Sequence, residues 1–112
     1  MTGKIGIDGS STVFKLTQAV AQQFSKLHHG VQLKVDKSGT GGGFKNFVQG
    51  TLDICDASRP IQASEMQQCK DNGVEYIELP VCFDALTVAV NEKNNWCKDL
   101  TVAELQKLWA PD

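Results

Sequence analysis

Three short loops carry the residues that could bind a ligand. They are residues 8–12, 38–43 and 56–60. Each loop offers hydroxyls and backbone N–H groups, and we expect each to lead into a helix whose unpaired N-terminal donors favour an anion. Glycines in the second loop let the backbone approach a ligand closely, and Arg59 adds a charged donor fork that suits an oxyanion. The loops therefore predict a site that holds a small oxyanion by many short hydrogen bonds.

Each loop has a plainer interpretation when it is taken alone. Residues 9–12 make a good helix cap, and residues 56–60 make a turn with Arg59 in a surface salt bridge. The second loop is more suggestive, because three consecutive glycines carry an entropic cost that a simple turn rarely needs. It fits neither nucleotide motif, because Phe44 stands at the last glycine of G-x-G-x-x-G and no P-loop Lys-Ser/Thr follows. The three loops together favour a function.

Other chemistry has little support in the sequence. No C-x-x-C and no Cys/His pattern has zinc spacing, so we expect no metal and no cofactor. No nucleophile has an evident base, and no two carboxylates form an acid/base couple, so we expect no enzyme. Of the cysteines, Cys55 and Cys82 lie in apolar runs and are expected in the core, whereas Cys69 and Cys97 are expected to be more exposed. Their disulfide pairing stays open.

The loops need an alternation of strands and helices to position them. Apolar residues at three- and four-residue spacing predict a helix that Ser11 or Thr12 caps and that runs to about Leu27. The other expected helices are a short one after Gly43, then residues 64–72 and 101–109. The expected strands are residues 4–7, 31–35, 52–57, 76–81 and 86–90. This order predicts an open, mainly parallel α/β sheet with helices on both faces, whose carboxyl edge holds the loops.

Local signals set the ends of these helices. Ser64 with Gln67, and Thr101 with Glu104, are expected to form capping boxes. Gly30 and Gly73 are expected in the left-handed position that ends a helix.

Bulk composition limits the class of protein. The 112 residues suit one compact domain, with 41% hydrophobic and 21% charged residues and a net charge of -2. No basic stripe suggests nucleic acid, and no apolar run is long enough for membrane insertion. No signal peptide precedes the first strand, so we expect either a cytosolic protein or a mature piece expressed from an engineered Met1.

The three loops, in order, resemble one protein family. Residues 9–14, 38–44 and 56–61 are similar to the periplasmic phosphate-binding proteins of the bacterial high-affinity phosphate ABC transporter. Residues 76–80, 86–91 and 100–105 also resemble that family. The resemblance implies one lobe of a type II periplasmic-binding-protein fold. It also implies a periplasmic or extracellular receptor that binds inorganic phosphate for import, with the transporter's membrane subunits as partners.

Carried over residue by residue, the resemblance implies a phosphate site in the three loops. Asp56 would accept the proton of monohydrogen phosphate and repel sulfate, which has none to give. Asp8 is a second candidate for that role. The implied phosphate-binding residues are Ser10, Ser11, Thr12, Ser38, Gly39, Thr40, Gly41, Asp56, Ser58 and Arg59.

Nearly all of the family's second lobe is missing from this chain. The resemblance divides the chain into a lobe-one core (1–80), a crossover strand (81–91) and the start of lobe two (92–112). Residues 86–109 would then either fold back locally or be exchanged between two copies in a swapped homodimer. Three different functions also stay open. They are a fragment that does not bind alone, an enzyme acting on phosphate esters, and a receptor for another oxyanion.

Overall fold

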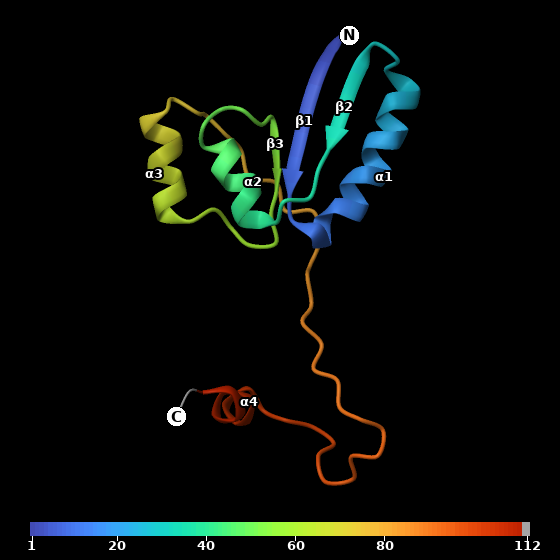
Figure 1. Ribbon diagram of the computed structural model, residues 1–112, viewed down its shortest axis with the longest axis vertical. Coiled ribbons are helices and arrows are strands. Elements are labelled where there is room, and N and C mark those ends of the chain that lie inside the picture. The colour runs from blue at the N-terminus through green and yellow to red at the C-terminus, as the bar shows by residue number, and fades with distance from the viewer. Residues whose placement is uncertain (111–112) are drawn as a thin grey trace.

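The computed structural model describes residues 1–110 (Figure 1). Residues 111 and 112, which end the predicted segment 92–112, lie outside the described residues. The elements are β1 (Gly3–Gly9), α1 (Ser11–Leu27), β2 (Val31–Val35), α2 (Thr40–Phe47), β3 (Ile54–Asp56), α3 (Ala63–Asp71) and α4 (Val102–Trp109).

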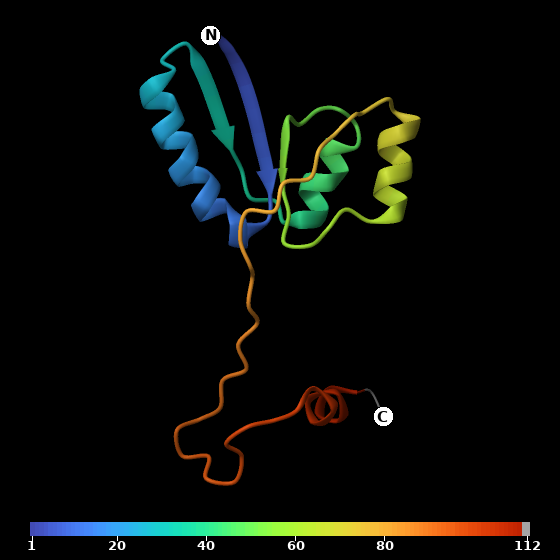
Figure 2. The ribbon, with the colours of Figure 1, turned by 180° about the vertical axis from the view of Figure 1, so that it is seen from behind.

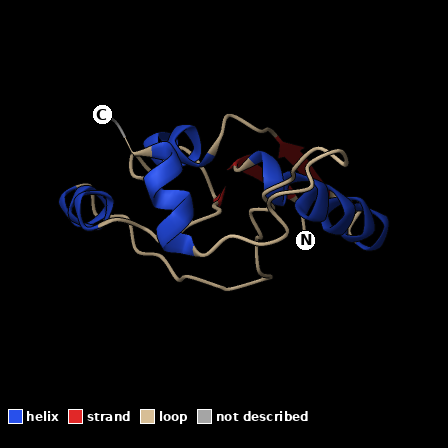
Figure 3. Cartoon of the chain, turned by 90° about the horizontal axis from the view of Figure 1, so that it is seen from below, coloured by secondary structure: helices blue, strands red, loops and turns tan. Residues whose placement is uncertain are grey.

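The described strands form one open parallel sheet in the order β2-β1-β3. The crossover from β1 to β2 moves along the sheet in one direction, and the crossover from β2 to β3 moves back in the opposite direction. Right-handed crossovers therefore place α1 and α2 on opposite faces of the sheet. Seen from below, the strands lie between α1 on one side and the other helices on the opposite side (Figure 3). The predicted α/β class, with an open parallel sheet, is confirmed.

Helix α1 forms where its apolar spacing predicts, although it buries little of itself. Ala21 is its one fully buried side chain among the described residues, whereas Leu16, Val20 and Leu27 are exposed. The sheet beneath it is only three strands wide, so most of the apolar stripe has nothing to cover it. The buried apolar side chains are instead spread over several elements, with Ile7 on β1, Val31 on β2, Phe44 on α2 and Val48 directly after it.

Two predicted strands are wrong. Residues 76–81 and 86–90 have no regular structure. Their sequence favours strands, but a strand forms only when a neighbour completes its hydrogen bonds, and the described sheet ends at β2 and β3. Pro80 also lacks the N–H that such pairing needs.

The capping predictions are partly confirmed. The Thr101 N–H donates to Glu104 Oε2 at 2.8 Å, and the Glu104 N–H donates back to Thr101 Oγ1 at 3.3 Å. The predicted capping box of Ser64 and Gln67 is wrong, because α3 begins earlier, at Ala63. Its capping box is formed by Gln62 and Glu65, and the Gln62 N–H donates to Glu65 Oε2 at 2.8 Å.

The two glycines predicted to stop helices behave differently. Gly73 has a positive φ of 67°, as predicted, but Gly30 is not among the positive-φ residues. A Cβ at Gly30 would lie 2.6 Å from the Met1 carbonyl oxygen, so close approach of the N-terminal chain explains that glycine.

The molecule is elongated because its last third leaves the lobe. Its radius of gyration is 18.9 Å, whereas a compact domain of this length has about 13 Å. Figures 1 and 2 show the chain running down from the lobe as an extended segment to α4. Phe83 and Leu86 are almost fully exposed there, and α4 buries no residue. The division at residues 80 and 91 stays a prediction.

The cysteines do not lie as predicted. Cys69 and Cys97 are buried, Cys55 is half-buried, Cys82 is exposed, and all four are free thiols. Cys69 lies on the inner face of α3. Cys82 is exposed because the strand predicted directly before it, residues 76–81, does not form.

Two features are absent from residues 1–110. Among them, no helix combines the length and apolar character that a membrane crossing requires. The same residues contain no cluster of three or more His, Cys, Asp or Glu side chains that could hold a metal ion.

Candidate functional site

The three predicted loops meet at the carboxyl edge of the sheet. In Figure 1 the strands point downward, and α1, α2 and α3 all begin at that lower edge. Backbone hydrogen bonds join the loops: the Ser10 N–H donates to the Asp56 carbonyl at 2.8 Å, and the Gly39 N–H donates to the Gly9 carbonyl at 2.7 Å. Distant parts of the sequence are therefore held as one rim, here called the loop rim (residues 8–12, 38–43 and 56–60).

Two helix N-termini open onto the loop rim without side-chain caps. The first hydrogen bond of α1 joins the Phe14 N–H to the Ser10 carbonyl at 3.0 Å, and that of α2 joins the Gly43 N–H to the Gly39 carbonyl at 2.9 Å. The N–H groups of residues 11–13 and 40–42 thus have no partner inside their helices. Neither helix has an acidic residue in its first turn. Both ends therefore present free donors and partial positive charge to an anion.

Residues 40–43 were predicted to be loop but form the first turn of α2, and two glycines of this turn are required by close packing. A Cβ at Gly43 would lie 2.7 Å from Gly9 Cα and 2.9 Å from the Asp8 carbonyl oxygen, and a Cβ at Gly42 would overlap the Ser38 side chain. Gly39 has a positive φ of 87°, which glycine adopts without strain. Gly41 differs, because a Cβ there would meet nothing within 4 Å. Packing does not explain Gly41, whereas ligand approach would.

Asp8 is buried and fully hydrogen-bonded. Its Oδ1 accepts from the N–H groups of Gly9 and Ser38, both at 2.8 Å, and its Oδ2 accepts from the Ser38 hydroxyl at 2.7 Å. Burial raises the pKa of Asp8, but the hydrogen bonds from Ser38 and Gly9 outweigh it and hold that pKa below its usual value. Asp8 is therefore an ionised group that fixes the second loop.

Asp56 is equally buried but only half satisfied. Its Oδ1 accepts from the Thr17 hydroxyl at 2.9 Å, whereas nothing in residues 1–110 donates to its Oδ2. Burial raises the pKa of Asp56; the Thr17 hydrogen bond opposes this rise and the charge of Asp8 adds to it. A buried acceptor without a donor is costly. Either a proton on Asp56 itself or the O–H of a bound ligand would remove that cost.

The third loop contacts the start of α2. The hydroxyls of Thr40 and Ser58 lie 3.1 Å apart, and the Ser58 N–H donates to Thr40 Oγ1 at 3.3 Å. Both nitrogens at the end of the Arg59 fork donate to Glu65, at 2.8 and 2.7 Å, and the guanidinium lies over the Phe44 ring at 4.9 Å. The salt-bridge interpretation of Arg59 is thus the arrangement observed here.

Sequence reasoning missed two residues of this site. Thr17 and Glu65 hold Asp56 and Arg59 respectively. Nothing in the sequence marks Thr17, which lies 39 residues from its partner. Glu65 could have been recognised from the sequence, because it lies three positions after Gln62, the N-cap residue of α3, which is the spacing of a capping box.

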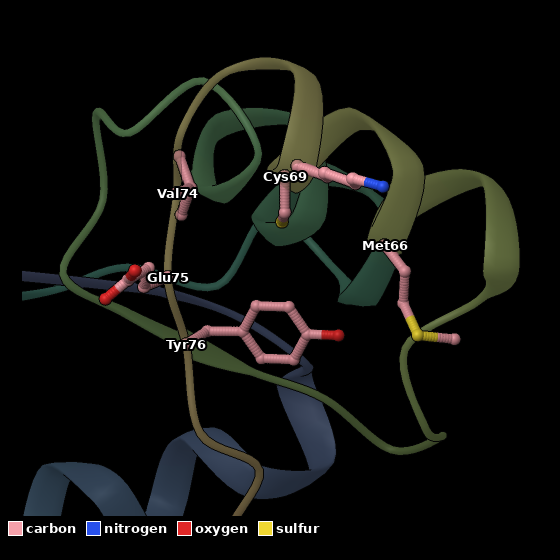
Figure 4. Close-up of a pocket in the computed structure, with 6 residues that line it drawn as sticks. Met66, Cys69, Val74, Glu75 and Tyr76 are labelled. Carbon is pink, nitrogen blue, oxygen red and sulfur yellow. The ribbon is translucent and has the colours of Figure 1, made fainter.

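A pocket on the lobe lies away from the loop rim. It measures about 470 Å³ and lies between α3 and the chain that follows it. Figure 4 shows Tyr76 reaching from that chain toward Met66, with Cys69 and Val74 above the ring in this view. A smaller cavity of about 250 Å³ between α2 and α3 includes Gly41 and Glu65 in its lining. None of the ten predicted site residues lines the larger pocket.

The sequence pattern of the PBP superfamily domain matches residues 2–111. The chain belongs to this superfamily. It is 55% identical over 107 residues to Protein SphX of Synechocystis sp., covering 96% of this chain and 32% of that protein. It is 35% identical over 103 residues to the phosphate-binding protein PstS of Staphylococcus epidermidis, covering 92% of this chain and 32% of that protein. The chain therefore spans about a third of the length of these curated relatives.

Solved structures agree on the fold. A possible phosphate-binding protein from Planctomyces limnophilus aligns with the whole chain and 39% of its own length, at a TM-score of 0.83 and 48% identity. A putative substrate-binding protein of a phosphate ABC transporter from Clostridium perfringens, solved with bound phosphate, aligns with 59% of this chain and 27% of its own, at a TM-score of 0.56 and 29% identity. The chain has the fold of part of one lobe of such proteins. The relative from Staphylococcus epidermidis and both of these solved structures are named as binding proteins.

Proposed function

We propose that this chain is the phosphate-binding lobe of a solute receptor for ABC-type phosphate import. The observation that carries the proposal is Asp56, a buried carboxylate with one oxygen unpartnered, placed beside two uncapped helix N-termini. Those N-termini suit the charge of an oxyanion, and Asp56 suits its proton. An ion that is both anionic and a hydrogen-bond donor, such as protonated phosphate, satisfies both at once.

Each part of the loop rim has a role in this proposal. Backbone N–H groups of Ser11, Thr12 and Gly41 bind phosphate oxygens directly. Hydroxyls at the three helix entries add further contacts, and Asp56 accepts a phosphate proton. Arg59 is a ligand only to the extent that its remaining donors reach the ion, because Glu65 occupies much of the fork. The full set of proposed ligands is Ser10, Ser11, Thr12, Ser38, Gly39, Thr40, Gly41, Asp56, Ser58 and Arg59.

The proposal places the receptor in the periplasm or outside the cell, with the transporter's membrane subunits as its partners. The relatives are about three times as long as this chain, so a second lobe would close over the loop rim. Exchange of residues 86–109 between two copies is the competing arrangement, and the exposed apolar side chains of that segment favour some partner. Light scattering on the chain distinguishes the two arrangements by its molecular mass, because a folded monomer at low concentration excludes exchange.

The test is a titration of the ¹⁵N-labelled chain with inorganic phosphate, followed by amide chemical shifts. We expect saturable shifts concentrated at the amides of residues 11–13 and 40–42, and none of comparable size with sulfate at the same ionic strength. An Asp36→Asn variant serves as a control, since Asp36 pairs with Lys34 at 2.6 Å and takes no part in the proposed contacts. Equal shifts with phosphate and sulfate would reject the proposal, and so would shifts spread evenly over the surface.

A further inference from the structure

The end of α3 is fixed to the end of α2 by one side chain. Asn72 is the C-cap residue of α3, and its Nδ2 donates to the Val48 carbonyl oxygen at 2.6 Å. Val48 is the C-cap residue of α2 and is only 2% exposed. Carbonyls at the end of a helix lack partners inside it, so the Asn72 amide satisfies a group that the helix itself leaves open.

The backbone after Asn72 closes α3 in a fixed geometry. The Val74 N–H donates to the Cys69 carbonyl at 2.8 Å, and the Gly73 N–H donates to the Lys70 carbonyl at 3.2 Å. Together with the positive φ of Gly73, 67°, these two bonds form the Schellman motif that commonly ends a helix. The Gly73 nitrogen is therefore held by the helix that it follows.

The pair Asn72-Gly73 is also chemically labile. The backbone nitrogen of the next residue can attack an asparagine side-chain amide, and a glycine in that position has no side chain to hinder the attack. Asn72 is the one asparagine of this sequence that precedes glycine, and the others precede larger residues. The amide and the nitrogen that fix the end of α3 are thus also the two groups that can react with each other.

We propose that Asn72 is a deamidation site whose reaction releases α3 from α2. The Gly73 nitrogen forms a bond to Asn72 Cγ and gives up its proton, and the side-chain nitrogen takes up a proton and leaves as ammonia. Water then opens the resulting succinimide ring at one of its two carbonyls, which gives aspartate or isoaspartate at position 72. Water is the only co-reactant. This inference is independent of the proposed phosphate site.

Both products remove the contacts that fix α3. A carboxylate at position 72 has no N–H for the Val48 carbonyl, and its charged oxygen would face that carbonyl oxygen. Isoaspartate also adds a methylene to the backbone before Gly73, which displaces the two closing hydrogen bonds of the helix. Cys69 is the one buried residue of α3 among the described residues, so little other packing compensates.

The folded chain should slow the reaction. The attack requires Gly73 to leave the Lys70 carbonyl and Asn72 to leave the Val48 carbonyl, so it proceeds only while the end of α3 is open. Peptide mapping by mass spectrometry, at mildly alkaline pH, measures the rate in the native chain and in guanidinium chloride. We expect the native rate at Asn72 to be at least about tenfold lower. Equal rates, or an earlier reaction at another asparagine, would overturn the inference.

Asn72→Asp supplies one product directly, and Asn95→Asp is its control. Asn95 is exposed, so the control makes the same change of charge away from α3. At neutral pH, the hydrogen-exchange protection of amides 72–74 should fall at least about tenfold in Asn72→Asp and stay unchanged in Asn95→Asp. Protection should return at acidic pH, because a protonated carboxyl can again donate to the Val48 carbonyl.

Unchanged protection in a folded Asn72→Asp variant would overturn the release of α3. If that variant does not fold, native chain that has been aged until part of it is deamidated gives the same measurement. Equal protection of amides 72–74 in its modified and unmodified fractions would overturn the inference as well.

Discussion

Substitution of alanine at two glycines of α2 should have opposite effects. At Gly43 the new Cβ would lie 2.7 Å from Gly9 Cα and 2.9 Å from both the Asp8 carbonyl oxygen and Cys55 Sγ. Two of these atoms are backbone of β1, the central strand, which cannot shift without disturbing both neighbours. Overpacking costs about 1–3 kcal/mol, and rigid neighbours favour the upper end. Replacing glycine by alanine inside a helix also stabilises the helix by about 1 kcal/mol, which offsets part of the overpacking cost. Gly43→Ala should therefore destabilise the lobe by about 2 kcal/mol.

Gly41 is the matched control in the same helix. A Cβ there meets nothing within 4 Å, so Gly41→Ala should leave stability unchanged or raise it by up to about 1 kcal/mol. Thermal unfolding followed by circular dichroism measures the contrast. A loss of about 2 kcal/mol lowers the Tm of a domain of this size by about 8–16 °C. Equal Tm values for the two variants would refute the packing argument.

The same pair separates stability from binding. If phosphate approaches the start of α2, the methyl group of Gly41→Ala should weaken binding at least about tenfold, which is about 1.4 kcal/mol, in a protein that is no less stable. Unchanged affinity in a folded Gly41→Ala variant would remove Gly41 from the binding site.

Three further predictions follow from the site and the extended segment. The raised pKa of Asp56 means that its contribution to stability is present below its unfolded pKa and is lost as pH rises through its folded pKa. Asp56→Asn should therefore stabilise the ligand-free chain by about 1–3 kcal/mol at neutral pH, little at acidic pH, and abolish discrimination against sulfate, as urea unfolding and titration would show. Glu65→Gln removes the charge and one of the two oxygens that accept from Arg59, so it frees one nitrogen of the fork. Phosphate binding should become stronger at low salt, and this gain should vanish as salt screens it; a gain that persists at high salt would contradict this. Brief chymotrypsin treatment should cut first at Phe83 or Leu86, which are almost fully exposed in unstructured chain, and leave the lobe intact; first cuts within α1 or α2 would contradict the observed packing.

The sequence predicted those elements whose signals are local. Strand β2 has the predicted bounds and helix α1 ends where predicted, because a compact apolar run and helical spacing act within their own residues. The start of α1 is earlier than predicted, since its N-cap residue is Ser10 and not Ser11 or Thr12. The box at Thr101 and Glu104 is likewise local. Residues 76–81 and 86–90 failed for the opposite reason. Their pattern fits a strand, but strand formation depends on a neighbour, and the described sheet supplies none.

The loop rim was predictable from topology, but the roles within it were not. Parallel strands bring their carboxyl ends to one edge, so loops far apart in the sequence had to meet. Which carboxylate remains unpartnered depends on side chains that find each other across the fold. Ser38 reaches Asp8 over 30 residues, and Thr17 reaches Asp56 over 39. No spacing rule connects such pairs, and the sequence left both Asp8 and Asp56 as candidates for the proton acceptor.

The carboxylates of Asp8 and Asp56 differ because they accept different numbers of hydrogen bonds. Asp8 receives three donors and Asp56 one, so burial is compensated at the first and not at the second. Two buried like charges also disfavour each other, and Asp56, which accepts fewer hydrogen bonds, is the one whose pKa is raised. One carboxylate can therefore stay charged and hold a loop, while its neighbour exchanges a proton with a ligand. An additional donor to Asp56 Oδ2 would erase the difference, and with it the basis for telling protonated phosphate from sulfate.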